Sequence, residues 1–318
     1  MPEYKKINCE NFGDMTEISN DFCKITIPHD FGPRILGFSL ERQENSKEQE
    51  SRLEKYENVF YTDASKEPLG DKLDVYEDQI ILYGGHRLWV SPEVLPRCYH
   101  PDNKPVSIVQ TPTGSDIIGA PEEKTMIQKT ISIDFAKDKP KVLITHTIKN
   151  LGLWDIEFAP WAITMLRSGG MEVLPIPHTD SGLLPYLSLS IWPYDHLGDA
   201  RIILDEDLAF INQSADDDRP FKVGYNNTAG WSIYKLAHIA FAKRFGSHIE
   251  GEKYPDGGCN FETYTNDKML EMETLGKIRI VKPGESAELK EEWALIPDLG
   301  FDIKTFEAYD GIIKTAFA

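Results

Sequence analysis

Long hydrophobic runs and an excess of positive charge are both missing from this sequence. No apolar run approaches the ~20 residues that a membrane-spanning helix needs, and the opening residues, MPEYKKINCENFG, contain no apolar signal-peptide core. The 34 Lys and Arg residues against 52 Asp and Glu give a formal net charge of -18, which disfavours nucleic acid and anionic membrane surfaces as partners. We therefore expect a cytoplasmic protein with no nucleic-acid and no membrane partner.

Cofactor and metal motifs are absent as well. The four cysteines, Cys9, Cys23, Cys98 and Cys259, occur singly and without CxxC spacing, so free thiols are expected rather than disulfides or a zinc site. The sequence contains no GxGxxG or Walker glycine loop and no repeat of fixed period. The three aspartates of SADDDRPF lack the spacing of a known calcium loop. We expect no cofactor and no metal.

What the sequence does contain is a long series of short strand patterns. Residues 125–135 and 141–149 alternate apolar and polar side chains around an AKDKP turn, which predicts an antiparallel hairpin. Pro160 lies inside an apolar run, which favours an edge or bulge position, and GWSIYKLAHIAFAKRF fits a helix or two strands. KIRIVKPGESAELKEEW predicts a further hairpin, and FDIKTFEAYDGIIKTAF a short closing helix. We expect an all-β chain of large antiparallel sheets in a single domain over 1–318, with an exposed charged insertion at 41–57.

One predicted hairpin carries an unusual number of acids. Residues 259–265 and 269–275 flank Asn266-Asp267-Lys268, and a two-residue turn at Asn266-Asp267 pairs Glu262 with Glu271. Because side chains alternate with period 2, one face carries Phe261, Thr263, Leu270 and Met272, and the other carries Asn260, Glu262, Tyr264, Glu271 and Glu273. Like charges across a strand pair destabilise a sheet, so a proton, a cation, a nearby Arg or His, or solvent must compensate them.

The motifs together resemble a known family. MLEMETLG followed by VKPGESAELKEEW, the opening ITIPHDFGPRILGF and the middle THTIKNLGLWDIEFAPW are similar, in order, to segments of the galactose mutarotase-like (aldose 1-epimerase) superfamily, and YGGHRLWVSPE resembles an uncharacterised branch of it. The resemblance implies a β-supersandwich, a sugar or oligosaccharide ligand and acid/base opening and closing of a sugar hemiacetal. It places the general base at Glu273. The family's histidine motif falls at Ala159-Pro160-Trp161, which has no histidine.

Other residues must then supply the acid and the sugar contacts. We expect His86, which follows Gly84-Gly85, to act as the general acid, with His178 as a second candidate. Sugar ligands are expected at Arg87, Glu262 and Glu271, with Trp161 and Trp89 as stacking rings. Each of these residues could instead have a purely structural role: His86 as a hydrogen-bonded loop histidine, Arg87 as part of a salt bridge, and the tryptophans as core aromatics. An isomerase of the aldose 1-epimerase type is the preferred function; a catalytically silent sugar-binding protein and, less favoured, a polysaccharide lyase on the same fold remain open.

Overall fold

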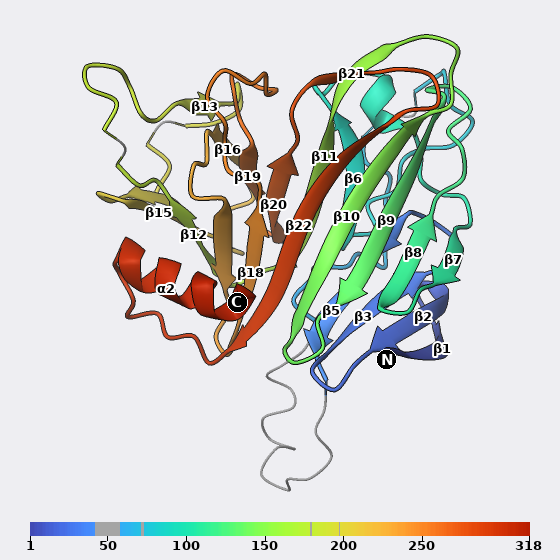
Figure 1. The fold of residues 1–318 in the computed structure, drawn as a ribbon, viewed down its shortest axis with the longest axis horizontal. Helices are drawn as coiled ribbons and strands as arrows, with labels where there is room; N and C mark the ends of the chain where they lie inside the picture. The colour runs from blue at the N-terminus through green and yellow to red at the C-terminus, as the bar shows by residue number, and fades with distance from the viewer. Residues whose placement is uncertain (42–57, 71–72, 179, 197) are drawn as a thin grey trace, which may run out of the picture.

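The computed structural model describes residues 1–41, 58–70, 73–178, 180–196 and 198–318. The described chain is built almost entirely from strands, which form three antiparallel sheets (Figure 1). The predicted insertion at 41–57 lies, apart from Glu41, outside the described residues. No helix among the described residues is long and apolar enough to cross a membrane.

Two large sheets form the body of the molecule. In spatial order, the ten-stranded sheet contains β14 (Ile202–Leu204), β15 (Leu208–Asn212), β12 (Met171–Pro175), β17 (Trp231–Lys235), β18 (Ile239–Phe245), β22 (Ser286–Pro297), β10 (Lys141–Asn150), β9 (Ile127–Phe135), β8 (Gly114–Ile118) and β7 (Ser107–Gln110). The eight-stranded sheet contains β13 (Leu189–Ile191), β16 (Phe221–Tyr225), β19 (Phe261–Thr265), β20 (Met269–Leu275), β11 (Ile156–Arg167), β6 (His86–Ser91) and β4 (Arg34–Ile35), with β21 (Arg279–Val281) paired to β11.

Smaller elements complete the fold. A four-stranded sheet contains β1 (Glu3–Cys9), β2 (Gly13–Ser19), β3 (Cys23–Pro28) and β5 (Gly37–Leu40), and a 3₁₀ turn, η2, covers Arg97–Tyr99. Helix α2 (Phe306–Phe317) begins where the Thr305 side chain accepts a hydrogen bond from the Ala308 amide. Its apolar face, including Tyr309 and Ile313, packs on β17 and β18 (Figure 1).

The main core lies between the two large sheets. Alternation along β9 and β10 buries every second side chain, and Trp293 of β22 sits fully buried among Phe38, Phe60 and Phe241 at ring distances of 5.5–5.9 Å. Edge-to-face aromatic contacts of this kind add about 0.5–1.5 kcal/mol each beyond the burial of apolar area. The core therefore holds the two sheets together; α2 covers part of the other face of the ten-stranded sheet, and the other face of the eight-stranded sheet is left to carry polar groups.

Several expectations are met and two are corrected. β9 and β10 form the predicted hairpin, residues 231–245 form two strands, and the tail is a helix. The hairpin predicted at the Lys282–Glu285 turn does not form, because β21 pairs with β11 while β22 crosses to β10 and β18. Pro160 lies in the central strand β11 rather than at an edge, and the pairing with β6 runs through it. Its carbonyl accepts from the Gly276 amide on the other side of the strand, where the neighbour changes from β21 to β20, so its missing N–H falls at this break.

Candidate functional site

The face of the eight-stranded sheet that points away from the core is organised around the β19–β20 hairpin. Glu262, Tyr264, Glu271 and Glu273 lie on this face, as alternation predicts, but Glu262 pairs with Glu273 and not with Glu271. The turn holds four residues between Thr265 and Leu270, closed by the Asn266 amide bonding to the Met269 carbonyl at 3.2 Å. A register that differs by two residues keeps every side chain on its predicted face.

Two cations from other strands compensate these acids. Lys222 of β16 places its Nζ 2.8 Å from Glu262 Oε2 and 2.9 Å from Glu273 Oε2. Arg87 of β6 lies 3.4 Å from Glu271 Oε1, a looser contact. All five side chains are buried, with Glu271 retaining 7% exposure and Glu262 and Glu273 none. We call these five residues the polar face. Three carboxyls and two cations leave one negative charge if all are ionised.

Burial and mutual interaction determine the protonation of this set. Burial opposes the charge on Lys222, but Glu273 and Glu262 outweigh it and raise the pKa of Lys222 well above its usual value. Burial raises the pKa of Glu262 well above its usual range, against the opposing effect of Lys222. Burial also raises the pKa of Glu271 to about 7, with Arg87 opposing and Glu273 adding to the shift. We take Lys222 as protonated and shared by Glu273 and Glu262, with Glu262 the carboxyl of this pair whose pKa its burial raises.

Several buried polar atoms of the polar face have no hydrogen-bond partner among the residues that the structure describes. They are Arg87 Nε, Glu273 Oε1 and both carboxyl oxygens of Glu262. Lys222 Nζ is close to Glu262 Oε2 but not aligned for a hydrogen bond to it, so we count that contact as an ion pair only. Buried polar atoms are rarely left unpaired. Convergence of these atoms on one face is what a site for a polyhydroxylated ligand requires.

Aromatic rings surround the cations. Lys222 Nζ lies 4.8 Å from the centre of the Trp161 ring and 4.7 Å from that of Trp192, and the Arg87 guanidinium lies 4.3 Å from Trp89. Trp161 and Trp89 are each only 4% exposed, and Trp161 donates from Nε1 to Glu273 Oε2 at 2.7 Å. Trp161 and Trp89, the two rings expected to stack on a sugar, are therefore buried against the charged side chains instead. Trp192 is partly buried and Tyr194 is 44% exposed, so both rings are more open to solvent than Trp161 and Trp89.

The expectation for His86 is corrected by its position. Its neighbour Arg87 belongs to the polar face. His86 itself is fully buried on the opposite side of β6, where its ring packs on Trp293. His86 Nε2 lies 2.7 Å from His146 Nε2 of the ten-stranded sheet, and its Nδ1 lies 2.9 Å from Thr164 Oγ1. Adjacent strand residues point to opposite faces, so His86 has no access to a ligand on the polar face.

The histidine pair belongs to a buried network that joins the two sheets. His146 Nδ1 lies 3.0 Å from the Leu289 carbonyl, which makes this nitrogen the donor and leaves Nε2 to accept from His86. Lys243 donates to Thr164 Oγ1 at 2.8 Å and to the Met272 carbonyl at 3.0 Å, and pairs with Glu291 at 3.1 Å. Met272 lies between the two site carboxyls of β20. The network therefore braces the strands that carry the polar face.

The same network contains a possible metal-ligand set. Ligand atoms of His86, His146 and Glu291 lie within 4.8 Å of one another. Two histidine nitrogens bound tetrahedrally to one zinc at 2.0–2.1 Å would be roughly 3.3 Å apart, whereas these are 2.7 Å apart and bonded to each other. The Glu291 oxygens are already used by Lys243 and by Trp293 Nε1. The residues fit a closed hydrogen-bond network better than a metal centre.

His178, the second candidate acid, lies elsewhere. It is exposed, its ring packs against Tyr186 at 4.7 Å, and its amide bonds to Asp207. No contact between His178 and the polar face occurs among the described residues.

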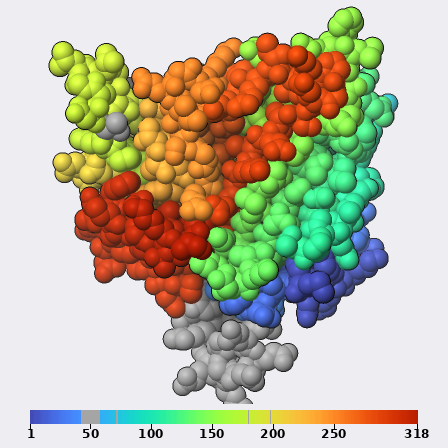
Figure 2. Space-filling model, viewed as in Figure 1, coloured from blue at the N-terminus to red at the C-terminus, as the bar shows by residue number. Residues whose placement is uncertain are grey.

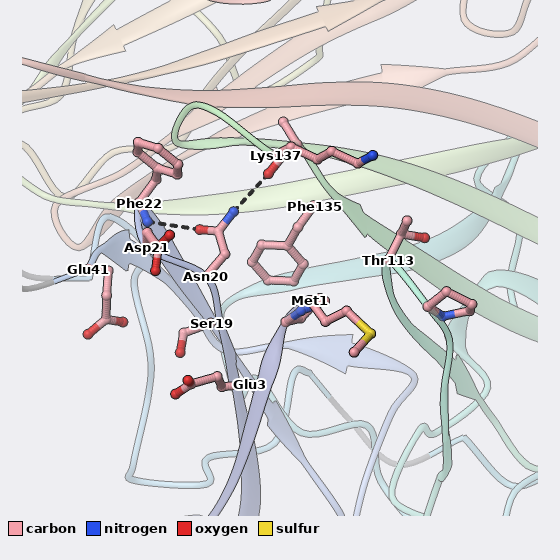
Figure 3. A pocket seen from close by; sticks show the side chains of 13 residues that line it. Met1, Glu3, Ser19, Asn20, Asp21, Phe22, Glu41, Thr113, Phe135 and Lys137 are labelled. Carbon is pink, nitrogen blue, oxygen red and sulfur yellow. Dashed lines mark hydrogen bonds between the residues drawn. The ribbon is translucent and has the colours of Figure 1, made fainter.

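A separate cavity of about 960 Å³ lies beside the N-terminal strands, lined by residues such as Ser19, Glu41 and Phe135 (Figure 3). It shares no residue with the polar face.

Sequence reasoning missed Lys222 and Tyr194. Lys222 lies in the segment FKVGY, where it is flanked by two apolar residues that point the other way. That alternation is a strand signal and places Lys222 on a polar side, but only the tertiary fold brings β16 beside β19. Tyr194 lies in a proline-rich aromatic segment with no periodic pattern.

Comparison with known proteins establishes the fold and nothing finer. No family model matches this chain, and no curated protein matches its sequence. Solved structures do match over most of the chain. A proposed mutarotase from Salmonella typhimurium is 11% identical with a TM-score of 0.55, covering 92% of this chain and 94% of its own. A galactose mutarotase-like protein from Lactobacillus casei is 9% identical with a TM-score of 0.55, covering 89% and 100%.

A third match is part of a larger protein. A TPR-domain containing protein from Parabacteroides distasonis is 11% identical with a TM-score of 0.59, covering 92% of this chain and 49% of its own. At such identities the likeness shows architecture alone. The chain has the galactose mutarotase-like fold, a sandwich of large antiparallel sheets, as the resemblance of its motifs implied.

Proposed function

We propose that the polar face binds an aldose and interconverts its anomers, as an aldose 1-epimerase does. The observation that carries this proposal is the pair of carboxyls on one strand, Glu271 and Glu273, held in different environments. Glu273 is paired with Lys222 and Trp161, whereas Glu271 is loosely held by Arg87 with a pKa of about 7. Two carboxyls whose environments differ are what paired acid and base catalysis needs.

The roles follow from the chemistry of ring opening. Glu273, as base, takes the proton from the anomeric hydroxyl while the bond between C1 and the ring oxygen breaks. Glu271, as acid, gives its proton to that ring oxygen and leaves an open-chain aldehyde. Rotation about the C1–C2 bond and reversal of both transfers closes the other anomer. Glu271 replaces His86 in this role because it shares the face with the base and retains some exposure.

Neighbouring groups would hold the sugar. The unpaired atoms of Arg87 and Glu262 are suited to sugar hydroxyls, and Trp192 and Tyr194 offer ring faces in place of the buried Trp161 and Trp89. The mutarotase-like names of the solved neighbours support a sugar as ligand.

Anomer exchange measured by saturation-transfer NMR on a panel of aldoses tests the proposal. We expect accelerated exchange with the wild type, and loss of the acceleration in Glu271→Gln and Glu273→Gln. The matched control is Glu288→Gln, an exposed glutamate of the ten-stranded sheet, which should keep full activity. Exchange that persists in both site variants would refute the assignment.

A catalytically silent sugar-binding protein is the second candidate, and one observation favours it. Glu273 has no exposed surface beneath Lys222 and Trp161, so a sugar reaches it only if covering side chains move. In this case no aldose shows accelerated exchange, while sugar resonances still broaden on binding and Arg87→Met abolishes the broadening. The two outcomes are distinct in the same NMR experiment.

A further inference from the structure

One loop crosses over the polar face. Residues 254–259, YPDGGC, lie between β18 and β19, and we call them the crossing loop. The Asp256 carbonyl accepts from Ser190 Oγ of the end strand β13 at 2.6 Å, and Asp256 Oδ2 accepts from Ser91 Oγ of β6 at 3.4 Å. Ser91 lies on the same side of β6 as Arg87, because alternate residues of a strand share a face. The yellow-green atoms of the β13 segment and the orange atoms of the crossing loop lie side by side (Figure 2).

The crossing loop adds a fourth carboxyl to the polar face. Four carboxyls then stand against two cations, Lys222 and Arg87, which leaves two negative charges if all six groups are ionised. Burial raises the pKa of Glu262 well above its usual range against the effect of Lys222, and the charges of Glu273 and Asp256 add to the rise. Protons therefore cover part of the missing positive charge, and a cation bound beside these carboxyls would take their place.

The buried atoms that lack a partner are mostly acceptors. Among the described residues of the polar face they are both oxygens of Glu262 and Oε1 of Glu273, against a single donor, Arg87 Nε. Lys222 contacts Oε2 of both glutamates and leaves both Oε1 atoms without a hydrogen bond. Glu262 has no exposed surface. A fully buried carboxyl with neither oxygen hydrogen-bonded indicates a ligand that supplies donors.

We propose that the ligand of the polar face is an amino sugar, an aldose that carries an ammonium group on C2, the carbon next to the anomeric carbon. The position rests on the proposed function, in which Glu273 takes the proton of the anomeric hydroxyl. Glu262 pairs with Glu273 directly across the hairpin, where Cβ atoms lie about 4.5–5.5 Å apart. A group beside the anomeric hydroxyl therefore meets Glu262.

An ammonium group matches both shortages of the polar face. It supplies three N–H donors and one positive charge, whereas a C2 hydroxyl supplies one donor and no charge. The rings around the carboxyls suit a cation as well. Trp161 and Trp192 already lie 4.8 and 4.7 Å from the ammonium of Lys222, and aromatic faces attract positive charge.

A ligand-observed NMR titration with D-glucosamine and D-glucose tests the proposal. The two sugars share one ring and differ at C2, where glucosamine carries an amine that is mostly protonated at about pH 6.5. The wild type should bind glucosamine about 10- to 100-fold more tightly, the range given by hydrogen bonds to charged groups. Equal dissociation constants for the two sugars would overturn the proposal. Methylammonium that competes as well as glucosamine would also overturn it, because the polar face would then bind any small cation.

Glu262→Gln keeps the shape of the side chain and removes its charge. In this variant the ratio of the glucose to the glucosamine dissociation constant should fall to near 1, with folding checked by circular dichroism. The matched control is Glu288→Gln, an exposed glutamate of the ten-stranded sheet, which should keep the wild-type ratio. A folded Glu262→Gln protein that also keeps that ratio would contradict the role of Glu262. The wild-type titration does not depend on any variant folding.

Anomer exchange in the same samples separates the ligand class from the proposed function. Accelerated exchange of glucose without tighter binding of glucosamine would overturn the amino-sugar proposal and leave the epimerase in place. Tighter binding of glucosamine without accelerated exchange of either sugar would support the amino sugar as ligand and refute the epimerase. Binding of neither sugar would overturn both.

Discussion

Removing Lys222 should convert the polar face from a compensated charge cluster into a pair of buried, unpaired carboxyls. Its Nζ is the cation closest to both Glu262 and Glu273, at 2.8 and 2.9 Å, and those two residues face each other directly across the hairpin. Breaking a buried ion pair by deleting one partner costs about 3–5 kcal/mol. We therefore expect Lys222→Met to lower the free energy of unfolding by that amount at pH 7.

A double-mutant cycle in urea separates charge from packing. Glu262→Gln removes one of the two carboxyls that lose their partner, so Lys222→Met should cost less in that background, with a coupling energy of about 0.5–3 kcal/mol. The loss in the single variant should also be smaller at pH 5 than at pH 8. The sign follows from the raised pKa of Glu262: its protonated form is favoured in the fold, so stability is retained at low pH and lost as pH rises.

The control is Lys290→Met, which removes an exposed lysine of the ten-stranded sheet and should change the free energy of unfolding by less than about 0.5 kcal/mol. Two results would contradict the reasoning. One is a Lys222→Met variant as stable as the wild type. The other is additivity of Lys222→Met and Glu262→Gln at both pH values, which would mean that Lys222 contributes packing rather than charge.

Three further predictions concern pH. Burial raises the pKa of Glu172, held by Ser232 and Thr263, to about 8. Its contribution to stability is therefore complete below about pH 4.5 and is lost as pH rises through 8, at up to ~1.4 kcal/mol per pH unit. Glu172→Gln should reduce this pH dependence of the unfolding free energy in urea melts, and an unchanged pH dependence would count against the prediction. Burial lowers the pKa of His86 well below its usual value and also lowers that of His146. Their contribution to stability is therefore complete above about pH 6.5, and below it the free energy of unfolding falls by up to ~2.7 kcal/mol per pH unit for the pair. The double variant His86→Gln, His146→Gln should lose less stability in acid than the wild type, and a steeper loss would disprove this. If Glu271 is the acid, anomer exchange should decline as pH rises through about 7; a rate that is flat from pH 6 to 8 would exclude that role.

Side-chain alternation made the three glutamates of the polar face predictable. Glu262, Glu271 and Glu273 share a face because a strand has period 2, and that conclusion survives any register change of two residues. The pairing partner of Glu262 was not predictable in the same way. It depends on a four-residue turn in which the Asn266 side chain accepts from the Lys268 and Met269 amides, and a two-residue turn was equally compatible with the sequence.

The all-β class, the β9–β10 hairpin and the acidic face followed from the sequence itself, because period-2 patterns and turn residues act within a few residues of each other. The tertiary structure alone decided which cation meets those acids and which histidine does not. Lys222 precedes Glu262 by forty residues of chain and reaches it only through the pairing of β16 with β19. His86 and Arg87 are adjacent in sequence, yet His86 is buried between the sheets and Arg87 points to the site. Which face of a strand meets the core is decided only when the sheets pack together.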